Sequence, residues 1–229
     1  MNAHADHLAF LVVTALCASI LVLAEALHRY FTLEPEWTRK LVHVLMGLTA
    51  TAFPWLFHDG RSVALLCALF AAILGASLAF SRLPSVHGVG RRTGGVLWFP
   101  LGVASVFAAA GGRADLYATA ILVLTLADPA AAMVGRARGT HRLRLGPGTR
   151  TLEGSCAFFL VACECLFLAL VLTTAHPAAD SFARAMGIAA LLTAVELVSP
   201  AGSDNFFVPT AALVLLRATA SGGMEQVHV

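Results

Sequence analysis

The chain has 229 residues, of which 59% are hydrophobic and only 12% are charged, and its mean hydropathy is +0.81. Soluble globular domains carry about 25% charged residues, so this composition excludes that class and indicates a membrane protein. The net charge of +2 gives no indication of a nucleic-acid partner, and we expect none.

Apolar runs long enough to cross a bilayer core of about 30 Å recur along the whole chain. They predict an all-α, polytopic integral membrane protein, with about eight transmembrane helices in one bundle and a single domain over residues 1–229. No Arg or Lys precedes the first run, so we expect a retained span rather than a cleaved signal peptide. The approximate spans are 8–28, 41–57, 62–80, 94–111, 115–134, 154–175, 182–199 and 206–221.

Basic residues are distributed unequally between the two sets of connections that alternating spans would create. The connections after the first, third, fifth and seventh spans hold eleven of the fifteen Lys and Arg residues. The positive-inside rule therefore makes that side cytoplasmic and places both termini outside. Together with the GC-rich amino-acid bias, this predicts the inner membrane of a bacterium. The eleven are Arg29, Arg39, Lys40, Arg82, Arg91, Arg92, Arg136, Arg138, Arg142, Arg144 and Arg150.

The second span begins with Arg39, Lys40 and His43, which helical spacing places on one stripe that continues to Gly47. Three donors would converge there, and the small residue would let another helix pack closely. The alternative is an interfacial Arg and Lys whose charged ends reach toward water, plus an incidental His.

Arg91 and Arg92 precede Gly94 and Gly95 at the start of the fourth span. A pair of arginines before a pair of glycines is suited to phosphate oxygens. An orientation signal for the membrane would look the same.

Asp128 and Pro129 stand near the end of the fifth span. The residue before proline is disfavoured in a helix, while Asp is a good N-cap and Pro suits a first helical position, so we expect a short helix to restart there. Capping alone would explain the Asp. Asp is also a hard oxygen ligand for Mg²⁺, and this one faces the basic loop that follows.

A basic, glycine-rich cytoplasmic loop is predicted at about 135–153. It lacks the spacing and the Lys of the G-x-x-x-x-G-K-[ST] phosphate loop. Gly135 and Gly139, with five arginines, still predict a flexible loop that could wrap a polyphosphate, although a patch for lipid head groups would look similar. The last such arginine, Arg150, opens the run that enters the sixth span, Arg150-Thr151-Leu152-Glu153-Gly154-Ser155.

Asp204 and Asn205 precede the last span, and Glu196 lies near the end of the seventh, on the same predicted face. N-capping of the last span would explain the first pair. Capping does not explain Glu196.

Six elements occur along the chain in this order: Arg39-Lys40-x-x-His43, Arg91-Arg92-x-Gly94, Asp128-x-x-Ala131-x-x-x-Gly135-Arg136-x-x-Gly139, Arg150-Thr151-Leu152-Glu153-Gly154-Ser155, Glu196 and Asp204-Asn205-x-x-x-Pro209. This ordered set resembles the dolichol kinase and phytol kinase family, membrane enzymes that phosphorylate lipid alcohols, typically with CTP. The resemblance covers about residues 36–212. It departs from the family at Ala127, where Gly is usual, and at Arg150-Thr151, where Lys-Ser or Lys-Thr is usual.

The resemblance implies transfer of the γ-phosphoryl group of CTP, or of another nucleoside triphosphate, to the hydroxyl of phytol, dolichol, a polyprenol or a farnesol-like alcohol. Asp128, with Asp204 or Glu153, would hold Mg²⁺, and one of these carboxylates or His43 would orient or deprotonate the alcohol. The nucleotide and its phosphates would be bound by Arg39, Lys40, Arg91, Arg92, Gly135, Arg136, Gly139, Arg150, Thr151, Gly154, Ser155 and Asn205.

Three other functions remain open at this point. A lipid cytidylyltransferase would bind CTP and Mg²⁺ at the same face but would form a CDP-lipid. A transporter would place polar groups near the bilayer midplane, where Glu164 is the one candidate. A membrane scaffold would use its polar groups for topology and capping alone.

Overall fold

The computed structural model describes residues 2–80, 83–87, 94–143, 150–174, 176–200 and 202–221. Within these ranges, eight long helices are joined by two four-residue helices and one short hairpin. The long helices are α1 (Asn2–Phe31), α2 (Pro35–Thr51), α4 (Gly60–Ala79), α6 (Gly95–Ala110), α7 (Ala114–Arg138), α8 (Leu152–Thr173), α9 (Ala178–Val198) and α10 (Asp204–Ser221). The short elements are α3 (Phe53–Leu56), α5 (Pro84–His87), β1 (Arg142–Leu143) and β2 (Arg150–Thr151), and β1 pairs with β2 in antiparallel register.

The protein is an all-α membrane protein, as the composition predicts. Five helices of the described chain are long and apolar enough to cross a bilayer, namely α1, α4, α7, α8 and α9, and α6 is apolar but shorter. The long helices follow the order of the predicted spans. That all eight cross the membrane stays a prediction.

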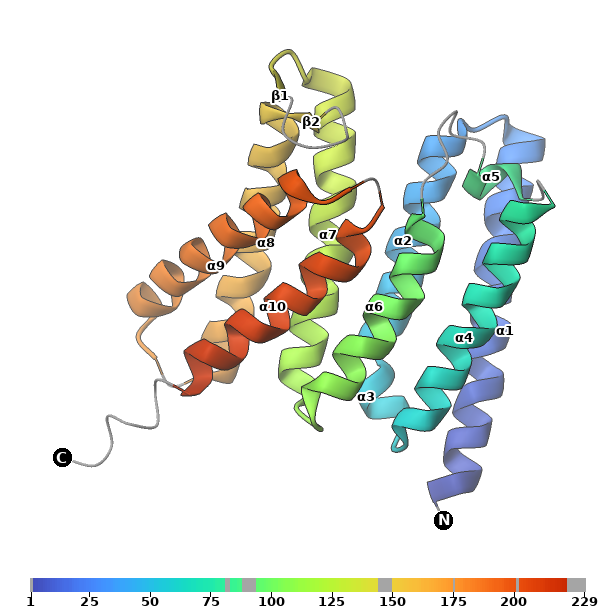
Figure 1. Cartoon of the computed structure of the whole chain (residues 1–229), viewed down its shortest axis with the longest axis horizontal. Coiled ribbons are helices and arrows are strands. Elements are labelled where there is room, and N and C mark those ends of the chain that lie inside the picture. The colour runs from blue at the N-terminus through green and yellow to red at the C-terminus, as the bar shows by residue number, and fades with distance from the viewer. Residues whose placement is uncertain are drawn as a thin grey trace.

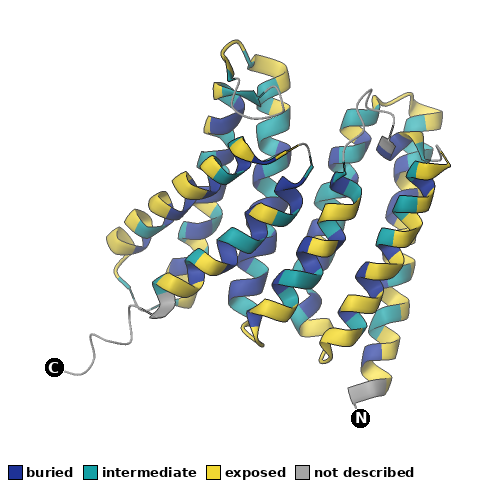
Figure 2. Ribbon diagram, in the orientation of Figure 1, coloured by how far each residue is buried: buried dark blue, intermediate teal, exposed yellow. Residues whose placement is uncertain are grey.

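The helices form two groups that meet along α7 (Figure 1). One group contains α1, α2, α4 and α6, and the other contains α7, α8, α9 and α10; α2 packs on α7, and α6 packs on α10. The innermost positions of α7, among them Tyr117 and Ile121, are fully buried, whereas α1, α4 and α9 expose apolar side chains along their outer faces (Figure 2). An exposed apolar exterior around a buried centre is the pattern expected of a helix bundle in lipid.

The C-terminal ends of α1, α4, α7 and α9 lie at one end of the bundle, which is the upper end in Figure 1. The N-terminal end of α1 and the C-terminal end of α10 lie at the opposite end. The long helices therefore alternate in direction along the chain, while their crossing of a membrane in that order stays a prediction. Which end faces the cytoplasm stays a prediction of the positive-inside rule.

The expectation that a helix restarts at Asp128-Pro129 is wrong, because α7 runs without interruption from Ala114 to Arg138 with Pro129 inside it. A proline removes one backbone donor and crowds the preceding turn. Membrane helices tolerate an internal proline when groups of neighbouring helices satisfy the backbone carbonyl that loses its donor. The carbonyl that loses its donor is that of Thr125, four residues before Pro129, on the turn of α7 that packs against Gly47 of α2.

The ends of the predicted basic loop belong to regular elements. Helix α7 continues to Arg138, β1 and β2 pair before α8, and α8 begins at Leu152, while residues 144–149 lie outside the described residues. Gly135 lies inside α7, where its missing side chain lets the helix approach Gly154 of α8. Gly135 therefore lies in the contact between α7 and α8, and its binding of phosphate stays a prediction.

Candidate active site

One stripe of α2 packs along α7 and carries side chains of the predicted site. Lys40, His43, Gly47 and Ala50 recur at spacings of three and four residues, which keeps them on one helix face. At the deep end, the hydroxyl of Tyr117 donates to the carbonyl of Ala50 at 3.0 Å. A β-carbon on Gly47 would overlap the side chain of Thr125, so the two helices are in close contact there. This contact brings the polar end of the stripe to α7.

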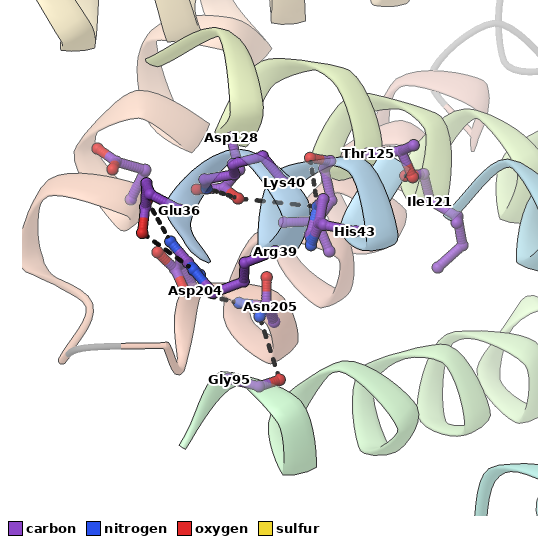
Figure 3. Close-up of polar contacts among 12 residues, drawn as sticks. Glu36, Arg39, Lys40, His43, Gly95, Ile121, Thr125, Asp128, Asp204 and Asn205 are labelled. Carbon is purple, nitrogen blue, oxygen red and sulfur yellow. Dashed lines mark hydrogen bonds and ion pairs between the residues drawn. The ribbon is translucent and has the colours of Figure 1, made fainter. Parts of the chain in front are cut away.

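At that polar end, Lys40 and Asp128 form a buried ion pair (Figure 3). The Lys40 Nζ donates to Oδ2 of Asp128 at 2.6 Å, and the two side chains are only 7% and 15% exposed. The Nε2 atom of His43 lies 3.7 Å from the same carboxylate oxygen. Its contact with the Leu124 carbonyl, which can only accept, places a hydrogen on Nε2. The edge of the Phe99 ring in α6 packs against the His43 ring.

Arg150 forms a second cluster with the ends of α9 and α10. Its guanidinium pairs with Glu196 of α9 and lies 3.4 Å from Oδ2 of Asp204 in α10. The Arg150 Nη2 also donates to the carbonyl of Ser199 at 3.2 Å. Glu196 and Asp204 are both buried. The start of α8, the end of α9 and the start of α10 therefore meet at Arg150.

The two clusters belong to one site, because the carboxylates of Asp128 and Asp204 are close enough to interact electrostatically and Lys40 acts on both. Three buried or nearly buried carboxylates, including Glu196, face the two basic groups of Lys40 and Arg150. With every group ionised, the site is therefore one charge negative. Buried charges are costly in a membrane protein and are a mark of function there.

Asn205 completes the site from the first turn of α10 (Figure 3). Its side-chain amide donates to the carbonyl of Gly95 at 3.2 Å, which ties α10 to the start of α6. A β-carbon on Gly102, two turns after Gly95 in α6, would overlap the backbone carbonyl of Asn205, so the two helices are in close contact there. The Asn205 Oδ1 is buried and accepts no hydrogen bond from the described residues.

The site fits a magnesium ion that is shared with a substrate. No three His, Cys, Asp or Glu side chains come together as a metal cage in the described ranges. Mg²⁺ in phosphoryl-transfer sites, however, takes one or two carboxylates and completes its shell with phosphate oxygens and water. Asp128 and Asp204 supply two carboxylates in a negative site, and the Oδ1 of Asn205 supplies a free acceptor beside them.

Two of the predicted basic residues pair with carboxylates outside the two clusters. Arg39 pairs with Glu36 at 2.6 Å and stands beside Asp204 in Figure 3. Arg136 pairs with Glu34 near the surface and is half-exposed. Arg91 and Arg92 lie outside the described residues. Only Lys40 and Arg150 thus contact the carboxylates of the site among the described basic residues.

Glu153 anchors the hairpin in this structure. Its Oε1 accepts from the backbone amide and the hydroxyl of Thr140, and the ring of His141 lies 2.8 Å away. Thr151 caps α8 through its hydroxyl, which accepts from the amide of Gly154 at 3.1 Å. These contacts fix the start of α8, and none of them brings Glu153 to Asp128 or Asp204.

The remaining predicted phosphate ligands also serve packing. The close approach of α7 and α8 depends on Gly135, Gly139 and Gly154, because a β-carbon on any of them would meet backbone or Thr151 atoms at 3.0 Å or less. Ser155 is buried in the first turn of α8. Their predicted contacts with phosphate stay predictions.

Sequence reasoning did not identify Glu34 and Glu36 as partners of the site arginines. Glu36 precedes Arg39 by three residues, so helical spacing alone could have indicated that pair. Glu34 is 102 residues from Arg136, and no local pattern connects them.

Comparison with known proteins identifies the family of this chain. No family model matches the chain, and no solved structure matches it. A curated protein of Synechocystis named phytol kinase is 30% identical over 205 residues, which cover 83% of this chain and 82% of the relative. With this identity and coverage, the chain belongs to the phytol kinase and dolichol kinase family of membrane-embedded lipid-alcohol kinases.

Proposed function

We propose that the protein transfers the γ-phosphoryl group of CTP to the hydroxyl of an isoprenoid alcohol, with phytol as the first candidate. The observation that supports this best is the buried Lys40–Asp128 pair beside Asp204 and Arg150 at one end of a bundle otherwise fit for lipid. The choice of phytol follows the name of the Synechocystis relative. The choice of CTP follows the family resemblance.

In this reaction the basic side chains stabilise charge. Phosphoryl transfer spreads negative charge over the oxygens of the γ-phosphate and the leaving nucleotide, and catalysis rests on positioned groups that stabilise it. Lys40 and Arg150 are held in place by carboxylates from other helices, so they need little reorganisation to serve phosphate. Arg39, Arg136 and the Arg91-Arg92 pair would add to the positive field around the nucleotide.

The carboxylates of Asp128 and Asp204 would hold Mg²⁺, which when bound neutralises phosphate charge and orients the triphosphate. The Oδ1 of Asn205 is a further acceptor for the ion or its water. The Nε2 atom of His43 lies 3.7 Å from Oδ2 of Asp128, so the imidazole ring stays beside the carboxylate that would hold the ion. Glu153 would contribute indirectly by fixing the hairpin that carries Arg150.

The location of the site explains why the enzyme is almost entirely membrane. A nucleotide reaches the end of the bundle from water, whereas an isoprenoid alcohol is confined to the bilayer and presents its hydroxyl at the interface. We place this end at the cytoplasmic face of a bacterial inner membrane, with both chain termini outside, because the connections there carry most of the basic residues.

The direct test uses protein purified in detergent or nanodiscs, with CTP labelled on the γ-phosphate. Candidate acceptors are phytol, farnesol, a polyprenol and diacylglycerol, and ATP and GTP are compared with CTP. Labelled phytyl phosphate together with CDP is the expected outcome. Release of pyrophosphate with formation of a CDP-lipid would instead assign a cytidylyltransferase, and turnover of no nucleotide would reject both enzymes.

A further inference from the structure

Glu196 stands apart from the other carboxylates of the site in how its two oxygens are used. It lies in the last turn of α9 and is only 4% exposed. One oxygen, Oε1, pairs with Arg150. The other, Oε2, is buried and has no hydrogen-bond partner among the residues that the structure describes.

The unpartnered oxygen is not needed to hold Arg150. The guanidinium already has the Ser199 carbonyl and Asp204 as partners, in addition to Oε1 of Glu196. A buried acceptor without a donor destabilises the fold, so its retention in a native site calls for a ligand that supplies the donor. Of the three carboxylates in the cluster, Glu196 is the one with such an oxygen among the described residues.

The surroundings indicate what kind of donor fits. The carboxylate that carries Oε2 is paired with Arg150, an arginine suited to phosphate. It also lies at the end of α9, whose outer face exposes apolar side chains such as Leu191 and Val198. A hydroxyl group on a lipid chain would meet both conditions, because its hydrogen needs an acceptor and its oxygen must face the γ-phosphate. Water or a cation would not require the neighbouring lipid-facing surface.

We infer that Glu196 is the catalytic base of the proposed kinase and that its Oε2 receives the hydroxyl proton of the lipid alcohol. This inference rests on the proposed function. The alcohol oxygen forms a bond to the γ-phosphorus while the bond from that phosphorus to its bridging oxygen breaks. The bonding electron pair leaves with the nucleoside diphosphate, and the proton remains on Glu196 until it passes to water.

Glu196→Gln is the decisive variant, because the amide keeps the shape of the side chain but cannot accept the proton. Asp204 still pairs with Arg150 in this variant, so no buried cation is left alone. General-base catalysis contributes about 10²- to 10⁴-fold, so kcat with phytol and CTP should fall at least about 100-fold. The KM for CTP should stay within about threefold of wild type, since nucleotide binding is not altered.

The matched control is Glu164→Gln, which neutralises another membrane glutamate that is exposed on the side of α8. It should keep wild-type kcat. If wild type itself transfers no phosphate, the proposed function fails; if wild type is active and Glu196→Gln retains its kcat, only the assignment of the base fails. A rise in the KM for CTP with kcat preserved would also overturn it, because that result would make Glu196 a positioning residue for Arg150.

A second measurement distinguishes a base from a structural group. An acceptor alcohol made more acidic by fluorine next to the carbinol carbon needs less help from a base, so it should restore kcat in Glu196→Gln by about 10-fold or more relative to wild type. The inference would be contradicted if the ratio of kcat for the fluorinated alcohol to kcat for phytol were the same in Glu196→Gln and in wild type. If thermal melting shows that Glu196→Gln does not fold, Glu196→Asp takes its place: it keeps the charge beside Arg150, withdraws the carboxylate by one methylene, and should lower kcat about 10-fold or more.

Discussion

The two ends of the bundle carry charged residues in different ways. At the end opposite the candidate site, Arg113 pairs with Asp115 two residues away, and both side chains are substantially exposed. At the site end, Lys40 pairs with Asp128 and Arg150 pairs with Glu196 and Asp204, over separations of 46 to 88 residues and with little exposure. A local exposed pair satisfies itself, whereas buried pairs assembled from distant helices require the whole fold.

One carboxylate at the opposite end shows that burial alone is not evidence of chemistry. Asp6 is buried and accepts from the backbone amides of His58 and Asp59, more than fifty residues away. These bonds tie the start of α1 to the turn before α4, and they use the carboxylate fully. The site end differs because its carboxylates oppose Lys and Arg and carry an excess negative charge, and because one of them, Glu196, has an oxygen without a donor among the described residues.

The largest effect should follow from Lys40→Ala, which leaves the Asp128 carboxylate buried without its cation. Breaking a buried ion pair from one side costs about 3–5 kcal/mol of unfolding free energy, and activity should be lost with it. Thermal melting and the phytol assay measure the two effects. Replacing both partners, as Lys40→Met with Asp128→Leu, should restore most of the stability and none of the activity. Recovery of activity in the double variant would contradict a catalytic role for the pair.

A smaller effect is expected from Gly47→Ala. The new β-carbon overlaps the Thr125 side chain, so α2 must move away from α7, at a cost of about 1–3 kcal/mol. Since Lys40 and His43 lie on the same stripe, kcat should fall about 10-fold or more. The further substitution Thr125→Gly removes the overlapping atoms, so it should restore part of the lost kcat. Gly187→Ala is the control, because nothing lies near a β-carbon at that position of α9.

Glu153→Gln should distinguish a role of Glu153 in anchoring the hairpin from a role in binding Mg²⁺. The variant weakens the contacts with Thr140 and His141, so amide hydrogen exchange in the hairpin should become faster and activity should decrease several-fold. The Mg²⁺ concentration for half-maximal activity should stay unchanged. A large increase in that concentration would show instead that Glu153 binds the ion, as the sequence allowed.

The smallest effect should come from Arg113→Gln at the opposite end. Exposed ion pairs contribute about 0–1 kcal/mol, so the melting temperature should change little, and phytol kinase activity should remain at the wild-type level. A loss of activity here would mean that the two ends of the bundle are coupled and that the contrast between them is incomplete.

Local patterns in the sequence predicted the long helices and one helix face of the candidate site. Hydropathy runs indicated the order of the long helices, and the spacing of Lys40, His43 and Gly47 predicted a stripe on which another helix packs. Helix α7 continues through Pro129, contrary to the local rule that the residue before a proline disfavours a helix. The contact of Arg150 with Glu196 and the anchoring role of Glu153 also arise from tertiary packing, which residue spacing does not encode.

The central claim is that the buried charges at one end of the bundle, and not buried charge in general, perform the phosphoryl transfer. Asp128→Asn and Asp6→Asn test it as a matched pair, because each neutralises one buried carboxylate with a distant partner, at opposite ends. With both variants shown to be folded, Asp128→Asn should lower kcat for phytol phosphorylation by about 10³-fold or more, while Asp6→Asn stays within about threefold of wild type. Equal activities of the two variants would contradict the account.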